Sequence, residues 1–245
     1  MLDRIERSFK ILKLTRKYFR ASQVPDNCEF NVNGLLCKVT GDHVLSMMLD
    51  IISNDSYGLK RFKTKTIDNI VDIGANVGVF SLHAHTLFPN ARLLAFEPST
   101  QSRQFLEKNT KGLNIEVYPY AVGNSRGKII LNELDDMSAS YISTEKDIAA
   151  LRSQECELIS LDDVVAKLQK PVSLLKLDCE GSEYEIMKSS ALKSFRYIVG
   201  EMHTCQHGDP TLGLKILNNN GFRIDKWFPF PDGLAGIFWA TNTNI

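Results

Sequence analysis

The residues with the clearest chemical potential are an acid and two glycines that follow an apolar run within residues 69–80. Asp72, Gly74 and Gly78 form the pattern D-x-G-x-x-x-G, in which the first glycine permits a tight turn and the second lets a helix pack closely. A dinucleotide loop would need G-x-G-x-x-G to approach a pyrophosphate. The spacing therefore favours a cofactor without a pyrophosphate, such as S-adenosylmethionine, whose sulfonium an acid can face. A plain strand-to-helix turn is the alternative.

A second acid stands where such a cofactor presents its ribose. Residues 91–97 form an apolar run that ends in Glu97, about 20 residues beyond the glycine turn. A carboxylate there can accept two hydrogen bonds from a ribose diol. Pro98 ends the expected strand and Ser99 can cap the next helix. The alternative interpretation of Glu97 is a solvated acid at a strand end.

A third group of acids follows two later apolar runs. Asp178 and Glu180 come after the run 172–177, while Glu201 and His203 end a further one. Because parallel strands end at one edge of a sheet, these side chains are expected to face the same crevice. A carboxylate or imidazole there could act as the general base that an alcohol nucleophile needs. His203 has the ordinary pKa closest to neutrality, although a structural histidine is the alternative.

The same acidic group has two further interpretations. Asp178, Glu180, Glu201 and His203 could hold a divalent cation that orients a hydroxyl, and residues 201–207 resemble a zinc-ligand run. No fixed spacing demands a metal, so none is assigned. The neighbouring acids Glu183 and Glu185 are assigned to the first turn of a helix, where a negative charge interacts favourably with the helix dipole. No catalytic role is assigned to them.

Strands and helices alternate after the glycine turn, which predicts a parallel α/β sheet. We expect strands at 67–73, 91–97 and 114–121, with helices at 78–88 and 99–109. Residues 135–154 are polar and predict a substrate loop or a solvated connection. The remaining expected elements are strands at 127–134, 172–178, 196–202, 222–228 and 235–241, and helices beginning at Ser160 and near 210–219.

Ahead of the sheet, residues 26–42 alternate around Asn33 and Gly34, which predicts a hairpin, and 43–52 predicts a short helix. We therefore divide the chain into an amino-terminal segment, 1–66, and a main domain, 67–245. Residues 1–20 form a basic amphipathic pattern. Such a helix could pack on the protein or a second subunit, or lie on an anionic membrane.

Composition narrows the class of protein. Basic and acidic residues number 29 each, so the formal net charge is zero. A nucleic-acid-binding protein normally carries an excess of basic residues, so the composition does not indicate a nucleic-acid partner. The five cysteines include no C-x-x-C pair, which favours reduced thiols and a cytoplasmic location. The sequence shows neither an apolar segment of about 20 residues nor a signal peptide, so we expect no membrane span and no secretion by that route.

Taken together, these motifs resemble the FkbM family of S-adenosylmethionine-dependent methyltransferases. The resemblance implies a class I, Rossmann-like α/β fold whose seven-stranded, mostly parallel sheet has helices on both faces and an antiparallel last strand. It also implies O-methylation of a hydroxyl on a sugar, glycolipid or natural product, with a small-molecule or glycan acceptor. The motifs are VDIGANVG (71–78), FEP (96–98), AVGN (121–124), SLDD (160–163), KLDCEGSE (176–183), and Glu201 with His203.

The resemblance also implies roles for individual residues. Asp72, Gly74, Asn76 and Gly78 would surround the methionine and ribose portions of the cofactor, and Glu97 would bind the ribose hydroxyls. Ala121 and Val122 would approach the adenine, and Asp178 and Glu180 would line the reacting end. Cys179 and Ser182 depart from the residues common in the family, without affecting cofactor binding. The segment before the sheet and residues 135–155 match no known pattern and are expected to hold the acceptor.

Two other functions remain open from the sequence. Tyr184 and Lys188 have the Y-x-x-x-K spacing of short-chain nicotinamide-dependent dehydrogenases, although the pyrophosphate glycines are missing. The basic pattern in residues 1–20 would instead suit a non-catalytic cofactor-binding or membrane-docking module.

Overall fold

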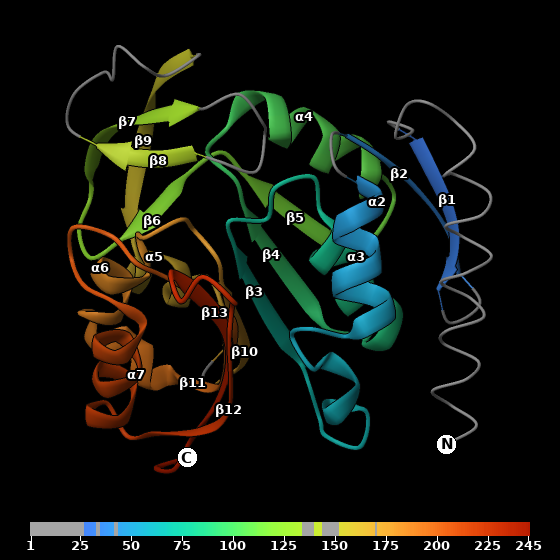
Figure 1. Cartoon of the computed structure of the whole chain (residues 1–245). Helices are drawn as coiled ribbons and strands as arrows, with labels where there is room; N and C mark the ends of the chain where they lie inside the picture. Colours follow the sequence, from blue (N-terminus) through green and yellow to red (C-terminus); the bar gives the residue numbers. More distant parts are fainter. Residues whose placement is uncertain (1–26, 33–34, 42–43, 134–139, 144–151, 170) are drawn as a thin grey trace.

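A seven-stranded sheet organises the part of the chain that the computed structural model describes, which is residues 27–32, 35–41, 44–133, 140–143, 152–169 and 171–245 (Figure 1). Its order is β12-β13-β11-β10-β3-β4-β5, and only β13 runs antiparallel to its neighbours. The predicted mostly parallel sheet with an antiparallel last strand is therefore confirmed. The strands are β3 (Asn69–Ile73), β4 (Arg92–Phe96), β5 (Ile115–Tyr118), β10 (Val172–Leu177), β11 (Phe195–His203), β12 (Phe222–Pro229) and β13 (Ala235–Asn242).

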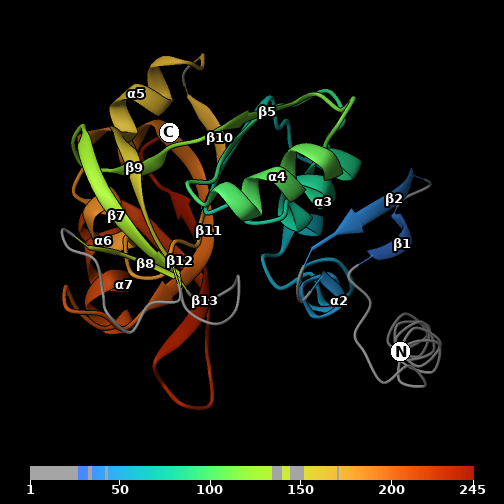
Figure 2. The same ribbon diagram turned by 90° about the horizontal axis from the view of Figure 1, so that it is seen from above.

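The central strands are buried because helices cover both faces of the sheet (Figures 1 and 2). Every residue of β3 and β10 is buried, as their apolar runs predict for strands inside a parallel sheet. On one face lie α2 (Val44–Met47), the π-helix η1 (Met48–Asn54), the 3₁₀ helix η2 (Leu59–Phe62), α3 (Val79–Leu87) and α4 (Thr100–Asn109). On the other lie α5 (Leu161–Ala166), α6 (Glu183–Met187), the 3₁₀ helix η3 (Ser190–Ser194) and α7 (Pro210–Asn219).

The segment ahead of the sheet forms the expected hairpin. Strands β1 (Asn27–Val32) and β2 (Leu35–Thr40) pair antiparallel. Leu59 and Phe62 join the hydrophobic cluster that contains Ile70, so residues near 60 share the core of the main domain. The division at residue 66 stays a prediction, and the pattern in residues 1–20 lies outside the described residues. No helix in the described residues is long and apolar enough to cross a membrane.

A second, four-stranded sheet differs from the expectation. It has the order β6-β9-β7-β8 and consists of β6 (Ala121–Gly123), β7 (Gly127–Glu133), β8 (Ser140–Ser143) and β9 (Arg152–Ser160). The prediction of a single strand over 114–121 is wrong, because β5 ends at Tyr118 in the seven-stranded sheet and β6 belongs to the four-stranded sheet. The loop expected over 135–154 is also wrong where β8 and the start of β9 lie. Polar residues such as Ser153 and Gln154 gave β9 no strand-like sequence pattern. The strand forms because its backbone pairs with β7.

The helix expected at Ser160 begins there with a reciprocal cap. The Ser160 hydroxyl accepts a hydrogen bond from the Asp163 N–H at 3.1 Å, and the Asp163 carboxylate accepts one from the Ser160 N–H at 3.1 Å. This capping box satisfies two N–H groups that the first helical turn leaves without partners. It fixes the point where β9 turns into α5, so the second sheet joins the main domain at a defined place.

Asn109 ties the hairpin to the glycine turn. Its side chain accepts a hydrogen bond from the Thr40 N–H at 2.9 Å and donates to the carbonyls of Thr40 and Val77 at 2.9 and 2.8 Å. Three backbone groups from two segments therefore depend on one amide. Figure 1 shows β2 beside α3 and α4, where this contact forms.

The Asn109→Ala variant is expected to lose about 2 kcal/mol of the free energy of unfolding, because it leaves backbone groups without their partners. Equilibrium urea unfolding measures the loss. Asn114→Ala is the matched control, since the Asn114 side chain makes one hydrogen bond, to the Ala91 carbonyl at 3.2 Å. Equal stabilities of the two variants would contradict the role given to Asn109.

Candidate active site

The glycine turn after β3 passes directly against the loop after β10. Gly74 has φ +74° and Gly78 φ +92°, both in the left-handed region. A Cβ atom on Gly74 would lie 1.8 Å from the carbonyl oxygen of Asp178, and no side chain can occupy that space. A Cβ atom on Gly78 would lie 2.7 Å from Leu106, so this glycine brings α3 close to α4 rather than to its own strand. Gly74 therefore lets two loops meet at the sheet edge, and Gly78 lets two helices pack closely.

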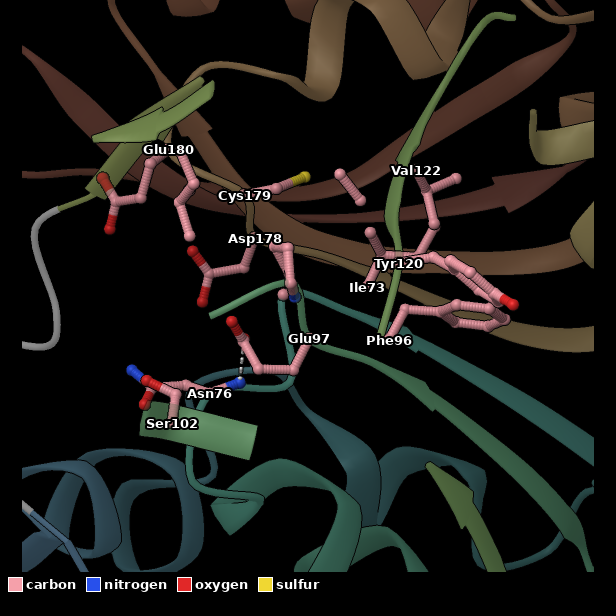
Figure 3. A pocket seen from close by; sticks show the side chains of 14 residues that line it. Ile73, Asn76, Phe96, Glu97, Ser102, Tyr120, Val122, Asp178, Cys179 and Glu180 are labelled. Atoms are coloured by element: carbon pink, nitrogen blue, oxygen red, sulfur yellow. Dashed lines mark hydrogen bonds between the residues drawn. The ribbon is translucent and has the colours of Figure 1, made fainter. Parts of the chain in front are cut away.

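A cavity opens at this edge and encloses about 670 Å³, its open mouth included. We call it the nucleoside cavity. Figure 3 shows side chains from the ends of β3 and β4, from the loop after β10 and from β6 converging on it. It brings together seven of the ten site residues predicted from the sequence: Gly74, Asn76, Glu97, Ala121, Val122, Asp178 and Glu180. Its other lining residues are Ile73, Phe96, Pro98, Ser102, Tyr120, Leu131 and Cys179.

Glu97 is buried at one wall of the nucleoside cavity. Its carboxylate accepts a hydrogen bond from the backbone N–H group of Asn76 at 2.7 Å (Figure 3) and another from the N–H group of Ser99 at 2.8 Å. Burial raises the pKa of Glu97 to about 7, against the effect of these two N–H groups. A carboxylate has about four lone-pair positions, so two backbone donors leave acceptor capacity for a ribose diol.

The lining of the nucleoside cavity fits S-adenosylmethionine. Phe96, Val122 and Leu131 supply apolar surface for a base, while Glu97 and Asp178 supply carboxylates. No Lys or Arg is among the described residues that border this cavity. A dinucleotide pyrophosphate would lack a cationic partner here, whereas an adenosine with a positive sulfonium matches the acids.

Asp72 lies behind the turn and does not border the nucleoside cavity. It is fully buried, accepts a hydrogen bond from the Ser81 hydroxyl at 2.6 Å, and lies 3.3 Å from the Lys176 ammonium. The direct cofactor contact expected of Asp72 is therefore not what the structure shows. Its carboxylate compensates the charge of a buried lysine, because an unpaired ammonium in the core would be costly.

Lys176 belongs to the family motif, although no role was expected of it from the sequence. Its ammonium donates a hydrogen bond to the Gly74 carbonyl at 2.5 Å and lies 3.5 Å from the Asp178 carboxylate. Burial opposes its charge, but Asp72 and Asp178 outweigh burial and raise the pKa of Lys176. A lysine inside the otherwise apolar run 172–177 was the sequence signal for this buried ion pair.

Tyr57 is a site residue that the sequence did not reveal. Its hydroxyl donates a hydrogen bond to Asp178 at 2.7 Å, and its ring packs edge-on against Phe80. Burial acts to raise the pKa of Asp178, but Lys176, His203 and this hydrogen bond together lower it. Asp178 is therefore held ionised. Tyr57 stands 121 positions earlier in the chain, outside any regular pattern, so no motif indicated it.

His203 has carboxylates at both ring nitrogens. Nδ1 lies 3.1 Å from Glu183, and Nε2 lies 3.1 Å from Glu201 and 3.5 Å from Glu180. Burial opposes the charged ring, but the hydrogen bonds to Glu183 and Glu201 outweigh it and raise the pKa of His203 to about 12. A ring that is already protonated cannot accept a proton at neutral pH. The role of His203 as general base stays a prediction, and the carboxylates at both ring nitrogens favour a positioning role instead.

Glu183 orients the imidazolium and the loop after β10. It is fully buried and accepts hydrogen bonds from the N–H groups of Cys179 and Gly181, both at 2.8 Å. The sequence assigned it to a helical turn without chemistry. It does begin α6, but the same carboxylate also fixes the ring of His203. Its influence on the site is therefore one of positioning.

Glu180 and Glu97 both have a pKa raised toward neutrality, and Glu180 is the one of the two that lies beside His203. It has φ +53°, a conformation rare for a residue with a side chain. Burial raises the pKa of Glu180 to about 8, although the positive His203 acts to lower it. An acid with a pKa near neutrality is the kind of group that general-base catalysis uses.

Asp178, Glu201 and His203 also offer one ligand atom each within 4.8 Å of one another. Among the described residues this set could hold a divalent cation. The sequence analysis did not favour a metal, and ion pairing with His203 accounts for the acids in the structure. The run of residues 201–207 does not form one zinc face, because β11 ends at His203.

The dehydrogenase spacing has a structural explanation. The Tyr184 side chain is buried, and its hydroxyl donates a hydrogen bond to the His203 carbonyl at 2.9 Å. Lys188 pairs with Glu185 on the surface of α6. Neither residue borders the nucleoside cavity. The Y-x-x-x-K pair therefore gives no support to a nicotinamide-dependent reaction.

The parallel sheet with its antiparallel last strand, the glycine turn and the acidic nucleoside cavity define a class I S-adenosylmethionine-dependent methyltransferase. A family model described as "Methyltransferase FkbM domain" matches residues 72–224, well over half of the chain. The chain belongs to the FkbM methyltransferase family.

Individual relatives are similar at moderate identity. The chain is 29% identical over 153 residues to methyltransferase sdnD of Sordaria araneosa, covering 49% of this chain and 59% of that protein. It is 26% identical over 196 residues to the 31-O-demethyl-FK506 methyltransferase FkbM of Streptomyces tacrolimicus, covering 64% and 73%. It is 27% identical over 201 residues to the synthetase AmbE of Pseudomonas aeruginosa, covering 63% of this chain but only 9% of that much longer protein.

Solved structures resemble the chain at low identity. Fibrillarin of Aeropyrum pernix, crystallised with natively bound S-adenosyl-L-methionine, has a TM-score of 0.48 and 14% identity, covering 77% of this chain and 74% of that one. Precorrin-6y C5,15-methyltransferase of Geobacter metallireducens has a TM-score of 0.46 and 14% identity, covering 77% and 88%.

Gly74→Ala is expected to weaken binding of S-adenosylhomocysteine, the demethylated cofactor, by at least about tenfold, or about 1.4 kcal/mol. The new methyl group would displace the Asp178 backbone from the cavity wall. Isothermal titration calorimetry measures the change. Gly112→Ala is the matched control, because Gly112 has φ +81° but a Cβ atom added to it would meet nothing within 4 Å. Its variant should lose about 1–2 kcal/mol of stability from backbone strain and keep its affinity. Equal affinities in both variants would contradict the close-contact role of Gly74.

Proposed function

We propose that this protein transfers the methyl group of S-adenosylmethionine to a hydroxyl group of a sugar, glycolipid or natural product. The observation that supports the proposal best is the position of Asp178 and Glu180, which border the nucleoside cavity at the end opposite its apolar walls. The relative from Streptomyces tacrolimicus is named for a methyl transfer to oxygen, which agrees with this choice. A small-molecule or glycan acceptor follows from it.

In the proposed reaction the cofactor supplies a methyl group on a positively charged sulfur. Glu97 would hold the ribose, Phe96 and Val122 the base, and the ionised Asp178 would face the positive charge. The acceptor oxygen bonds to the methyl carbon as the sulfur–carbon bond breaks, and that electron pair stays on sulfur. Glu180 takes the hydroxyl proton. Alignment of the two reactants accounts for most of the rate in such a transfer.

His203 acts in this proposal through its charge. As an imidazolium beside Glu180 and Glu201, it balances acids that would otherwise repel one another. The contact with Glu183 keeps its ring in one orientation. His203 is therefore a positioning residue, and the base role passes to Glu180.

Calorimetry with S-adenosylmethionine, S-adenosylhomocysteine and NADH tests the cofactor. We expect binding of the first two and none of NADH, because no cation borders the nucleoside cavity in the described residues. Binding of NADH alone would refute methyl transfer. A parallel assay with EDTA should leave turnover unchanged, and a loss that Mg²⁺ restores would move Asp178, Glu201 and His203 to a metal role.

Glu180→Gln is expected to lower kcat by about 10²–10⁴-fold, because the amide cannot accept the acceptor proton. In the native enzyme the active form is the carboxylate, so the rate should rise with pH through a pKa at or below about 8 and then level off. The variant should lose this rise. The pH profile of methyl transfer from labelled cofactor measures both effects.

Glu155→Gln is the matched control, since Glu155 pairs with Lys128 at the surface and borders neither the nucleoside cavity nor the other two cavities next to Glu180. An unchanged pH rise in Glu180→Gln would show that another group takes the proton.

A further inference from the structure

Three cavities meet at Glu180. One is the nucleoside cavity. A second, which we call the Tyr57 cavity, lies between the segment before the sheet and the glycine turn, and encloses about 820 Å³ with its mouth. A third, the Thr204 cavity, lies between the second sheet and the loop after β11, and encloses about 1300 Å³ with its mouth. Among the residues that the structure describes, Glu180 is the one that borders all three.

The geometry at Glu180 matches the three substituents of a sulfonium. The sulfur of S-adenosylmethionine bonds to the adenosyl group, the methionyl chain and the methyl group. The nucleoside cavity suits the adenosyl group because of its apolar walls and Glu97. Each of the other two cavities must then receive either the methionyl chain or the acceptor that approaches the methyl group.

The Tyr57 cavity and the Thr204 cavity differ in the charged side chains that line them. The Tyr57 cavity shares Gly74, Asn76 and Asp178 with the nucleoside cavity and adds the carboxyl groups of Asp50 and Glu201. Lys176 also borders it, but this buried ammonium is already paired with Asp72 and Asp178. It therefore continues the cofactor site and gathers acids around it, which suits the ammonium group of a methionyl chain.

The Thr204 cavity has a different lining. Val122, Ile129 and Leu158 form apolar surface. Hydroxyl, amide and thiol side chains form much of the polar lining, from Asn124, Ser125, Ser182, Thr204, Cys205 and Gln206. No Lys or Arg is among its described lining residues, and His207 lies 3.8 Å from the Glu185 carboxylate. A phosphorylated molecule would face Glu180 and Glu185 without a free cationic partner. Mixed apolar and hydrogen-bonding walls instead suit an uncharged molecule with many hydroxyl groups.

We propose that the Thr204 cavity binds the methyl acceptor, and that this acceptor is an uncharged, hydroxyl-rich molecule that reaches Glu180 from the side of Thr204. The inference rests on the methyl transfer proposed above. The sequence analysis expected the segment before the sheet and residues 135–155 to hold the acceptor. The inference moves the acceptor away from the first of these, since that segment borders the Tyr57 cavity through Asp50 and Tyr57.

The test changes one residue at each of the two cavities. Thr204 is exposed, so Thr204→Trp narrows the acceptor cavity without touching the core. Asp50→Lys reverses one charge at the Tyr57 cavity. Lys226→Trp, on the exposed side of the edge strand β12, is the matched surface control. Circular dichroism and thermal melting confirm that each variant is folded.

Two measurements apply to each variant. Calorimetry gives the affinity for S-adenosylhomocysteine. Saturation-transfer NMR on the protein with S-adenosylhomocysteine reports binding of neutral methyl glucoside, mannoside and galactoside, with glucose 6-phosphate as the anionic counterpart. We expect Thr204→Trp to weaken glycoside binding at least about tenfold, or about 1.4 kcal/mol, and to keep the affinity for S-adenosylhomocysteine. Asp50→Lys should weaken S-adenosylhomocysteine binding, and Lys226→Trp should change neither.

Three results would overturn the inference: glycoside binding that survives Thr204→Trp, no glycoside binding to the native protein, or equal binding of glucose 6-phosphate. Each leaves the proposed methyl transfer standing if the native protein still binds S-adenosylhomocysteine. Failure of the native protein to bind S-adenosylhomocysteine would instead remove the proposed function itself.

Discussion

The buried ammonium of Lys176 is the interaction on which the rest of the site depends. It lies between the carboxylates of Asp72 and Asp178 and donates to the Gly74 carbonyl. A lysine at this depth is tolerated only with such partners. One charge therefore links the ends of β3 and β10, sets the path of the glycine turn and keeps Asp178 ionised. The cofactor cavity forms on the outer side of this link.

Near Lys176, the surroundings of each carboxyl group set its pKa, so that similar side chains differ in protonation. Asp178 is ionised because Lys176, His203 and Tyr57 surround it, whereas burial raises the pKa of Glu180 to about 8. Glu97 keeps a raised pKa although two backbone N–H groups contact it. A site that faces a positive sulfonium and also removes a proton needs such a division between a permanent negative charge and a titrating one.

The expected fold was recovered where the pattern was local and periodic. The apolar runs of β3, β4, β10 and β11, the cap at Ser160 and the hairpin all appear where the chain predicts them. The second sheet was missed because β8 and β9 are polar and are held by backbone pairing with distant partners. Seven predicted site residues do border one cavity, since parallel strands end at a common edge.

What the sequence determined by itself is the class of cofactor and the edge of the sheet that binds it, because glycine spacing and strand-end acids are local features. The tertiary structure alone decided the protonation and the partners of those acids. It placed Asp72 behind the turn, brought Tyr57 onto Asp178, and set His203 between Glu183 and Glu201. A pKa depends on burial and on charges from segments far apart in the chain, and these distances exist only after folding.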